Sequence, residues 1–264
     1  MAAAKPVSSP RNPLLREVRR AIARGGLTSA GCAVAETFHL LEEALQSDCR
    51  VEFVLAAESV RTTVESRVRP LAEVQVLVLP DSLLREVAAT ETSQGVIALV
   101  RPPRWSLDQL FRNTPLLVVL DGLQDPGNAG TIIRSAEAFG ATGVLLLKGT
   151  VNPYNPKSIR ASAGSVFRLP LAHGVEAPLA RAAFERRRVD LYAAMPRGGR
   201  VVTELDLTRP CAFIVGSEGR GVGEDWRAAA RDVSIPVARV ESLNAAVAAA
   251  VLLYEAHRQR MSPV

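Results

Sequence analysis

The stretch LLVVLDGLQDPGNAGTIIRSAEAFGATGVLLL, residues 116–147, decides the fold class of this 264-residue chain. It opens with the apolar run Leu116–Leu120 and closes with a second apolar run, Val144–Leu147. Between them, Ala129–Phe139 has the spacing of a helix, and Gly140 stands where a left-handed residue commonly ends one. Two short, continuously apolar strands joined by a helix predict a βαβ unit whose parallel strands are buried on both faces.

The same alternation continues to the C-terminus and predicts an α/β fold, with a mostly parallel sheet and helices on both faces. The last helix is expected over Leu243–Arg260, with Ser242 as its N-cap. Its residues Ala245–Tyr254 are apolar around the whole circumference, which indicates burial on more than one side. Central burial in a monomer and a subunit interface both explain this pattern. Further strands are expected at Val166–Leu171, Asp190–Ala194, Ala212–Gly216 and Val233–Val237.

The N-terminal part of the chain predicts a separate, small α/β domain over residues 13–100, because short strand patterns alternate there with helical ones. Residues 1–12 show no apolar periodicity and are expected to form a flexible basic tail. The proline-containing segment 101–114 is the predicted linker. The C-terminal domain is then expected over residues 115–264.

The net charge of +5 is concentrated at the N-terminus. Residues 1–30 hold six basic side chains against Glu17 alone, which gives +5 for this segment by itself. A basic cluster suits a polyanion such as RNA, because phosphate contacts release condensed counterions. A solvated helix face explains the charge equally well. The candidate RNA contacts in this segment are Arg11, Arg16, Arg19 and Arg20.

Composition argues against several classes of protein. The longest apolar run is far shorter than the ~20 residues of a membrane-spanning helix. The N-terminus lacks the apolar core of a secretory signal, so a cytoplasmic protein is expected, with a transit peptide as the alternative. The chain holds 3 cysteines without a CxxC pair, which suggests neither a disulfide framework nor a zinc site. No metal is expected.

Three C-terminal loops, each following a predicted strand, hold the candidate functional residues, since ligands of open α/β sheets bind beyond the carboxyl ends of strands. The first contains Asn128 and leads into a helix carrying Arg134, which alternatively pairs with Glu137 on the helix surface. The second, FIVGSEGRGVGEDW at 213–226, is rich in glycine around Glu218, and an ordinary turn is its alternative. The third contains Ser242 and Asn244, which alternatively do no more than cap the last helix.

Together, the three loops resemble the ordered motifs of the SpoU (TrmH-type) RNA methyltransferases of the SPOUT class, over roughly residues 115–260. The chain has neither GxGxxG nor GxxxxGK[ST], which argues against a dinucleotide-dependent oxidoreductase on a similar sheet. The residues that carry the resemblance are Asn128, Gly130 and Arg134, then Gly216-Ser217-Glu218-Gly219, then Ile235-Pro236 and Ser242-Leu243-Asn244.

The resemblance implies transfer of a methyl group from S-adenosylmethionine to a ribose 2′-hydroxyl of structured RNA. Ribosomal RNA is the expected substrate, and transfer RNA methylation or a catalytically silent RNA-binding module are the alternatives. The resemblance also implies a C-terminal trefoil knot in the parallel sheet and a homodimer packed through it. Residues 8–100 resemble, more weakly, a substrate-binding domain folded like certain ribosomal RNA-binding proteins.

The resemblance further implies roles for individual residues. Arg134 would bind the phosphate beside the target ribose and lower the pKa of the hydroxyl, since a guanidinium stays protonated and is a poor base. The phosphate or Glu218 would accept the proton, Asn128 would hold Glu218 or the ribose, and Ser242 and Asn244 would order the third loop. The expected donor-binding residues are Gly216, Ser217, Glu218, Gly219, Ile235, Pro236, Leu243 and Asn244.

Overall fold

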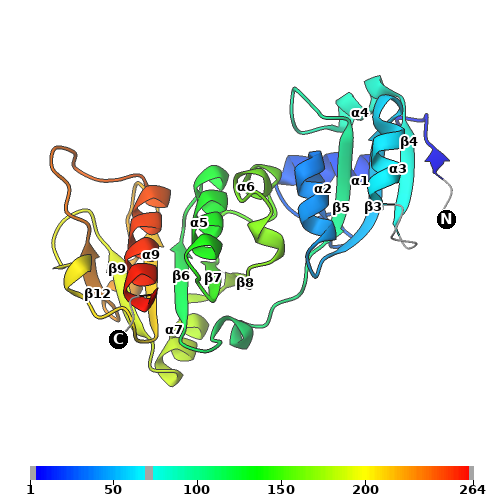
Figure 1. The fold of residues 1–264 in the computed structure, drawn as a ribbon. Helices are drawn as coiled ribbons and strands as arrows, with labels where there is room; N and C mark the ends of the chain where they lie inside the picture. The colour runs from blue at the N-terminus through cyan, green and yellow to red at the C-terminus, as the bar shows by residue number, and fades with distance from the viewer. Residues whose placement is uncertain (1–3, 69–73, 262–264) are drawn as a thin grey trace. The chain divides into compact units, whose positions relative to one another are not determined.

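Residues 4–68 and 74–261 are described by a computed structural model, in which the chain divides into two units (Figure 1). The N-terminal unit runs to Arg104 and also includes Tyr154–Arg168. The C-terminal unit contains Trp105–Pro153 and the chain from Leu169 onward. The boundary near residue 104 lies inside the predicted linker. The assignment of Tyr154–Arg168 to the N-terminal unit was not expected from the order of the chain.

The N-terminal unit contains a five-stranded mixed sheet in the order β1-β4-β3-β5-β2. Strands β1, β4 and β3 are parallel to one another, whereas β5 is antiparallel to both of its neighbours. The small α/β domain expected here is therefore confirmed. The strands are β1 Lys5–Pro6, β2 Ala33–Glu36, β3 Arg50–Ala57, β4 Gln75–Leu79 and β5 Val96–Arg101.

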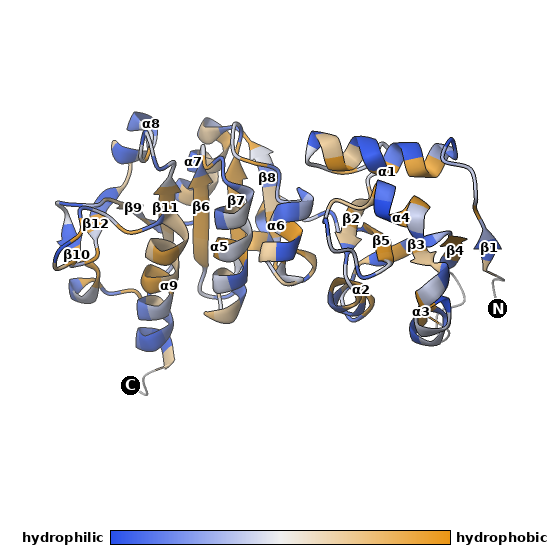
Figure 2. Cartoon of the chain, turned by 90° about the horizontal axis from the view of Figure 1, so that it is seen from above, coloured by the Kyte–Doolittle hydropathy of each residue, from blue (hydrophilic) through white to orange (hydrophobic). Residues whose placement is uncertain are grey.

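Helices cover both faces of this sheet (Figure 2). Helices α1 and α4 share one buried core with side chains of the sheet, while α2 and α3 lie on the opposite face. A further helix, α6, packs against β2 at the sheet edge. The helices are α1 Pro13–Arg24, α2 Phe38–Leu45, α3 Arg61–Val68, α4 Asp81–Val87 and α6 Pro156–Ala161.

The prediction of a flexible tail over residues 1–12 is wrong for Lys5–Val7. Lys5 and Pro6 pair with β4, and the Val7 amide donates to the Val78 carbonyl at 2.8 Å. Asn12 is also ordered, because its side chain accepts a hydrogen bond from the Leu14 amide at 2.9 Å and caps α1. Backbone pairing with the sheet edge provides an order that apolar periodicity does not reveal.

The C-terminal unit contains a seven-stranded sheet in the order β10-β12-β9-β11-β6-β7-β8, and every pairing within it is parallel. This confirms the predicted α/β class with a mostly parallel sheet. The trefoil knot stays a prediction. The strands are β6 Leu116–Asp121, β7 Gly143–Leu147, β8 Leu171–Val175, β9 Asp190–Ala194, β10 Arg200–Val201, β11 Cys211–Gly216 and β12 Arg231–Ser234.

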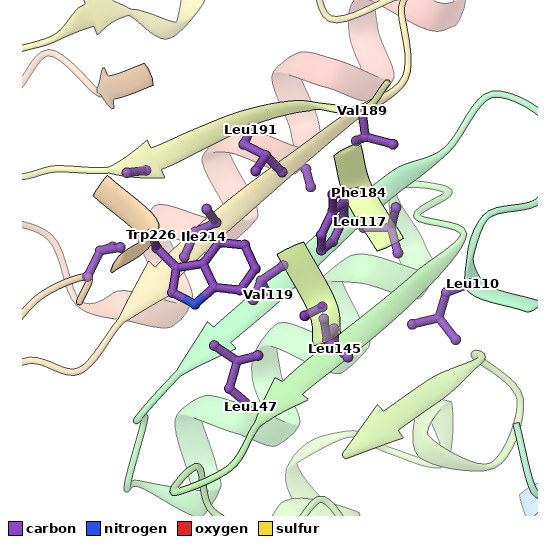
Figure 3. Packing of buried hydrophobic residues seen from close by; sticks show 14 of the residues in the cluster. Leu110, Leu117, Val119, Leu145, Leu147, Phe184, Val189, Leu191, Ile214 and Trp226 are labelled. Carbon is purple, nitrogen blue, oxygen red and sulfur yellow. The ribbon is translucent and has the colours of Figure 1, made fainter. Parts of the chain in front are cut away.

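Two helical layers bury this sheet. Helices α5, Pro126–Ala138, and α9, Ala245–Met261, pack against each other on one face. Helices α7, Ala177–Arg186, and α8, Glu224–Arg227, lie on the other face. There Phe184 and Trp226 pack edge to face with ring centroids 6.1 Å apart, over apolar side chains of the central strands (Figure 3). Burial on both sides explains why the strands are continuously apolar.

Several predicted boundaries need correction. Helix α5 begins at Pro126 rather than Ala129, because the Asp125 side chain accepts from the Asn128 amide at 2.7 Å and caps it. The predicted end at Gly140 is confirmed by its φ of +72°. The predicted strand Val166–Leu171 is wrong, since residues 165–167 form a short 3₁₀ helix and β8 starts only at Leu171.

Helix α9 is buried on one side only, and its other side is an exposed apolar face. Val247, Val251 and Tyr254 remain 49%, 36% and 55% exposed. Central burial therefore does not explain the apolar circumference of this helix. The buried side of α9 consists of Ala246, Ala249, Leu252, Leu253, Glu255 and Ala256.

Among the described residues, no helix combines the length and apolar character that a membrane span requires.

Candidate functional site

A cavity of about 560 Å³ lies where β9, β11 and β12 end. Parallel strands bring their carboxyl ends to one edge of a sheet, so the loops that follow them meet there. Its lining includes apolar side chains, such as Val215, and exposed backbone groups of a glycine-rich loop. Ligand pockets commonly have volumes of roughly 300–1,000 Å³, with a mainly apolar lining and few polar groups. The lining comes chiefly from segments 194–196, 215–221 and 242–245, with Val233, Ile235, Ala248 and Leu252.

The glycine-rich loop folds back on itself over the end of β11. Ser217 and Gly221 form an antiparallel bridge, and the Gly221 amide donates to the Ser217 carbonyl at 2.8 Å. A Cβ atom on Gly216 would lie only 2.0 Å from the Gly221 carbonyl carbon. Only glycine therefore fits at position 216 without a shift of the backbone. This close approach explains why the second motif begins with glycine.

The far end of the same loop is fixed by Asp121, which sequence analysis did not single out. One Asp121 carboxylate oxygen accepts a hydrogen bond from the Gly223 amide at 2.8 Å. Asp121 ends β6 and pairs with Gly216 of β11, so the carboxylate lies beside the start of the loop as well. The available sequence signal was an acidic residue directly at the end of a fully apolar strand.

Asn244 connects the third motif to the first. Its side-chain oxygen accepts from the amides of Ala246 and Val247, at 2.9 and 3.3 Å, which makes it the N-cap of α9. Ser242 was predicted as the N-cap, and that prediction is wrong because the helix begins two residues later. The Asn244 side-chain nitrogen donates to the side-chain oxygen of Asn128 at 3.1 Å.

Asn128 then connects the first motif to the second. Its side-chain nitrogen donates to a carboxylate oxygen of Glu218 at 2.5 Å. The orientation of each amide follows from its neighbour: the helix start requires the oxygen of Asn244, which leaves its nitrogen for Asn128. That in turn leaves the nitrogen of Asn128 for Glu218. One chain of hydrogen bonds therefore joins all three motifs.

The remaining predicted residues occupy three different places. Ser217, Gly219 and Leu243 line the cavity, as do Gly216, Glu218, Ile235, Ser242 and Asn244. Pro236 lines a neighbouring hollow instead. Arg134 is exposed on α5, outside the cavity lining, and in the described part of the chain it makes no ion pair with Glu137 or another carboxylate.

The N-terminal arginines differ in their availability. The side chain of Arg19 donates to the Pro10 carbonyl at 3.0 Å and lies 3.7 Å from a Glu86 carboxylate oxygen. The Arg20 side chain is 68% exposed, and its guanidinium lies 3.9 Å from a Glu17 carboxylate oxygen, so this ion pair is weak. Arg11 and Arg16 are exposed. Arg19 is therefore the least free of the four predicted RNA contacts.

Neither the cysteines nor a metal cluster adds further chemistry within the described residues. Burial raises the pKa of Cys32, Cys49 and Cys211 to about 11 each, so these thiols are protonated at neutral pH and poor nucleophiles. No group of at least three His, Cys, Asp or Glu side chains in the described ranges is arranged to hold a metal ion. The polar groups of the site are side-chain amides, the Glu218 carboxylate, the Arg220 guanidinium, two serine hydroxyls and backbone groups around the cavity.

Residues 115–254 match the model of the SpoU rRNA Methylase family. The chain belongs to the SpoU rRNA methylase family. Residues 12–98 match the MRM3-like substrate binding domain, and the predicted resemblance is thereby confirmed.

Relatives of this SpoU methylase are similar along most of the chain. It is 37% identical to the 23S rRNA (uridine(2479)-2′-O)-methyltransferase of Streptomyces viridochromogenes, over 71% of this chain and 68% of that protein. It is 29% identical to the 23S rRNA (guanosine(2553)-2′-O)-methyltransferase RlmP of Bacillus subtilis, over 95% and 98%. The crystal structure of the SpoU methyltransferase AviRb from Streptomyces viridochromogenes with AdoMet is similar with a TM-score of 0.86 and 29% identity, over 96% of this chain and 99% of that one.

Proposed function

We propose that this chain transfers the methyl group of S-adenosylmethionine to the ribose 2′-hydroxyl of a nucleotide in 23S ribosomal RNA. The observation that carries the proposal is the hydrogen-bonded chain from Asn244 through Asn128 to Glu218 at the edge of the cavity. It joins three motifs of a family whose named relatives methylate 23S rRNA at 2′-oxygens. Transfer RNA methylation and a silent RNA-binding module are the alternative functions.

The cavity fits a methyl donor of this kind. Val215, Ile235 and Leu243 supply apolar surface suited to a flat base, and Gly216 brings backbone groups close to the ligand without an intervening side chain. S-adenosylmethionine supplies an activated methyl group on a sulfonium, so the transfer itself needs no metal. The expected donor contacts are Gly216, Ser217, Glu218, Gly219, Ile235, Pro236, Leu243 and Asn244.

The residues around the cavity would then act on the ribose. Asn128 holds the Glu218 carboxylate in one orientation, where it or the RNA phosphate can accept the hydroxyl proton. Arg134 is exposed and free to bind a phosphate, and its positive charge favours the developing oxyanion. Ser242 and Asn244 order the third loop, Asn244 by capping α9. Catalysis in this scheme rests on position and electrostatics.

The experiment has a binding arm and a mapping arm. Calorimetry should show binding of S-adenosylmethionine and none of NAD, because the chain has no dinucleotide fingerprint. Mapping of 2′-O-methyl groups in RNA from cells with and without the protein should reveal one missing site in 23S rRNA. A missing site in transfer RNA would select the alternative substrate, and an unchanged map with intact donor binding would contradict the proposed activity.

We propose in addition a homodimer formed through the exposed side of α9 and the neighbouring α5. A shallow groove of about 350 Å³ lies there, lined by Phe139, Val247, Val251 and Tyr254 among others. Phe139 and Tyr254 pack edge to face with ring centroids 5.6 Å apart, so the two rings belong to one apolar face. A partner of the same sequence would remove it from water.

Light scattering tests the dimer. Val251→Glu should give a monomer at micromolar concentration, whereas Ala182→Glu, an exposed position on α7 across the sheet, should leave the mass of a dimer. A monomeric wild-type chain would refute this assembly.

Residues 13–100 are proposed as the RNA substrate-binding domain and residues 115–264 as the methyltransferase domain. The cytoplasm is the proposed location of the protein.

A further inference from the structure

A second hollow, of about 640 Å³, adjoins the donor cavity and shares Pro196 and Ile235 with it. Two arginines, Arg197 and Arg239, line this hollow against a single carboxylate, that of Glu241. Both arginines are exposed. The hollow is therefore a positively charged concave surface next to the site.

The fold places both arginines at the same edge of the sheet. Arg197 follows β9 and Arg239 follows β12, and these two strands are parallel neighbours. The turn after Arg197 has a fixed path, since Gly198 and Gly199 have φ of +80° and +74°. A Cβ atom on Gly199 would lie 2.4 Å from the Asp232 carbonyl oxygen, so the turn packs tightly on β12.

Three other arginines near these strands make contacts within the protein. Arg227 lies 3.2 Å from a carboxylate oxygen of Asp232, and Arg231 pairs with Asp190. Arg200 donates to the Glu204 carbonyl at 2.7 Å. Within the ranges that the structure describes, Arg197 and Arg239 form no such pair. Their charges are available for a ligand.

We propose that Arg197 and Arg239 bind phosphate groups of the RNA strand that enters the site, next to the nucleotide to be methylated. The inference rests on the proposed function and adds a contact surface in the C-terminal unit to the predicted basic cluster of the N-terminal one. A guanidinium presents a planar fork that matches phosphate oxygens. Sequence-specific RNA recognition mostly targets unpaired nucleotides in loops, bulges and ends.

A matched pair of double variants tests this surface in the full-length chain. Arg197→Gln with Arg239→Gln removes two charges from the hollow. Arg186→Gln with Arg209→Gln removes two exposed charges that precede β9 and β11, at the opposite, amino edge of the sheet. Affinity for in-vitro-transcribed 23S rRNA is measured as a function of salt, and donor binding is measured by calorimetry.

The two variants should separate clearly. The hollow variant should lower the log–log salt slope by ~1.4, since each contact with single-stranded phosphate contributes ~0.7. The amino-edge variant should keep the wild-type slope, and both should bind S-adenosylmethionine as the wild type does. An unchanged slope, an equal change in both variants, or weaker donor binding in the hollow variant would overturn the inference. A wild-type chain that methylates no RNA would instead count against the proposed function.

Discussion

Replacing Asn244 by aspartate separates its two roles. Its side-chain oxygen caps α9, and its side-chain nitrogen donates to Asn128. Aspartate keeps an oxygen for the cap and is as good an N-cap as asparagine, with a charge that the helix start favours. It cannot donate a hydrogen bond when ionised. We therefore expect Asn244→Asp to fold with wild-type stability, within about 0.5 kcal/mol.

The site should respond quite differently. With a carboxylate at position 244, the Asn128 amide lies between two carboxylates, and whichever way it turns its oxygen must face one of them. The Asn128–Glu218 hydrogen bond of 2.5 Å is then either lost or opposed by repulsion at the other end of the amide. Hydrogen bonds to charged groups contribute about 1.5–3 kcal/mol, and the exposed position of Glu218 argues for the lower end. A loss of about 1.5 kcal/mol corresponds to about tenfold in turnover.

The assay combines single-turnover methylation of 23S rRNA with thermal unfolding. Asn244→Ala is the comparison variant, because it removes the cap as well and should cost about 1 kcal/mol of stability. Asn244→Asp with unchanged turnover would refute the idea that the orientation of Asn128 matters. A large loss of stability in Asn244→Asp would refute the assignment of the oxygen as the cap.

Three further variants test the site and the basic cluster. Arg134→Ala should lower turnover at least ~100-fold, because about 3 kcal/mol of transition-state stabilisation is lost, and should leave the affinity for the methyl donor nearly unchanged. Methylation within threefold of the wild-type rate would contradict this role. Gly216→Ala should weaken donor binding in calorimetry, because the new methyl group would lie 2.0 Å from the Gly221 carbonyl carbon. Replacing Arg11, Arg16 and Arg20 by alanine should lower the log–log salt slope of rRNA binding by ~2 to 3. An unchanged slope would disprove the N-terminal contacts.

The parts of the fold that could be predicted are those fixed by short-range patterns. Leu116–Leu120 is fully buried, as continuous apolar strands of parallel sheets are, and its residues could be recognised without knowledge of their partners. Gly140 could be recognised as a helix end because helices commonly end at a left-handed residue, which is usually glycine. The order of the three motifs likewise identified the site, because each follows a strand.

The parts that could not be predicted depend on distant contacts. Val166 and Phe167 are fully buried, but in a 3₁₀ helix of the segment that joins the N-terminal unit, and periodicity cannot distinguish this from a short strand. The role of Asp121 depends on the Gly223 amide, 102 positions away in the sequence. Ser242 and Asn244 are both good capping residues, and which of them caps α9 depends on where the chain turns into the helix.

Capping and function were alternatives for the third motif at the level of sequence, and the structure shows that one residue combines the cap with a contact to another motif. The Asn244 oxygen satisfies two amides at the start of α9, which removes the freedom of its side chain to rotate. That loss of freedom fixes its nitrogen on Asn128, whose own backbone amide is held by the Asp125 cap of α5. The cap of α9 therefore orients the Asn244 amide, which in turn orients the Asn128 amide that donates to Glu218. A substitution that keeps the cap but not the donor is consequently the most direct test of the site.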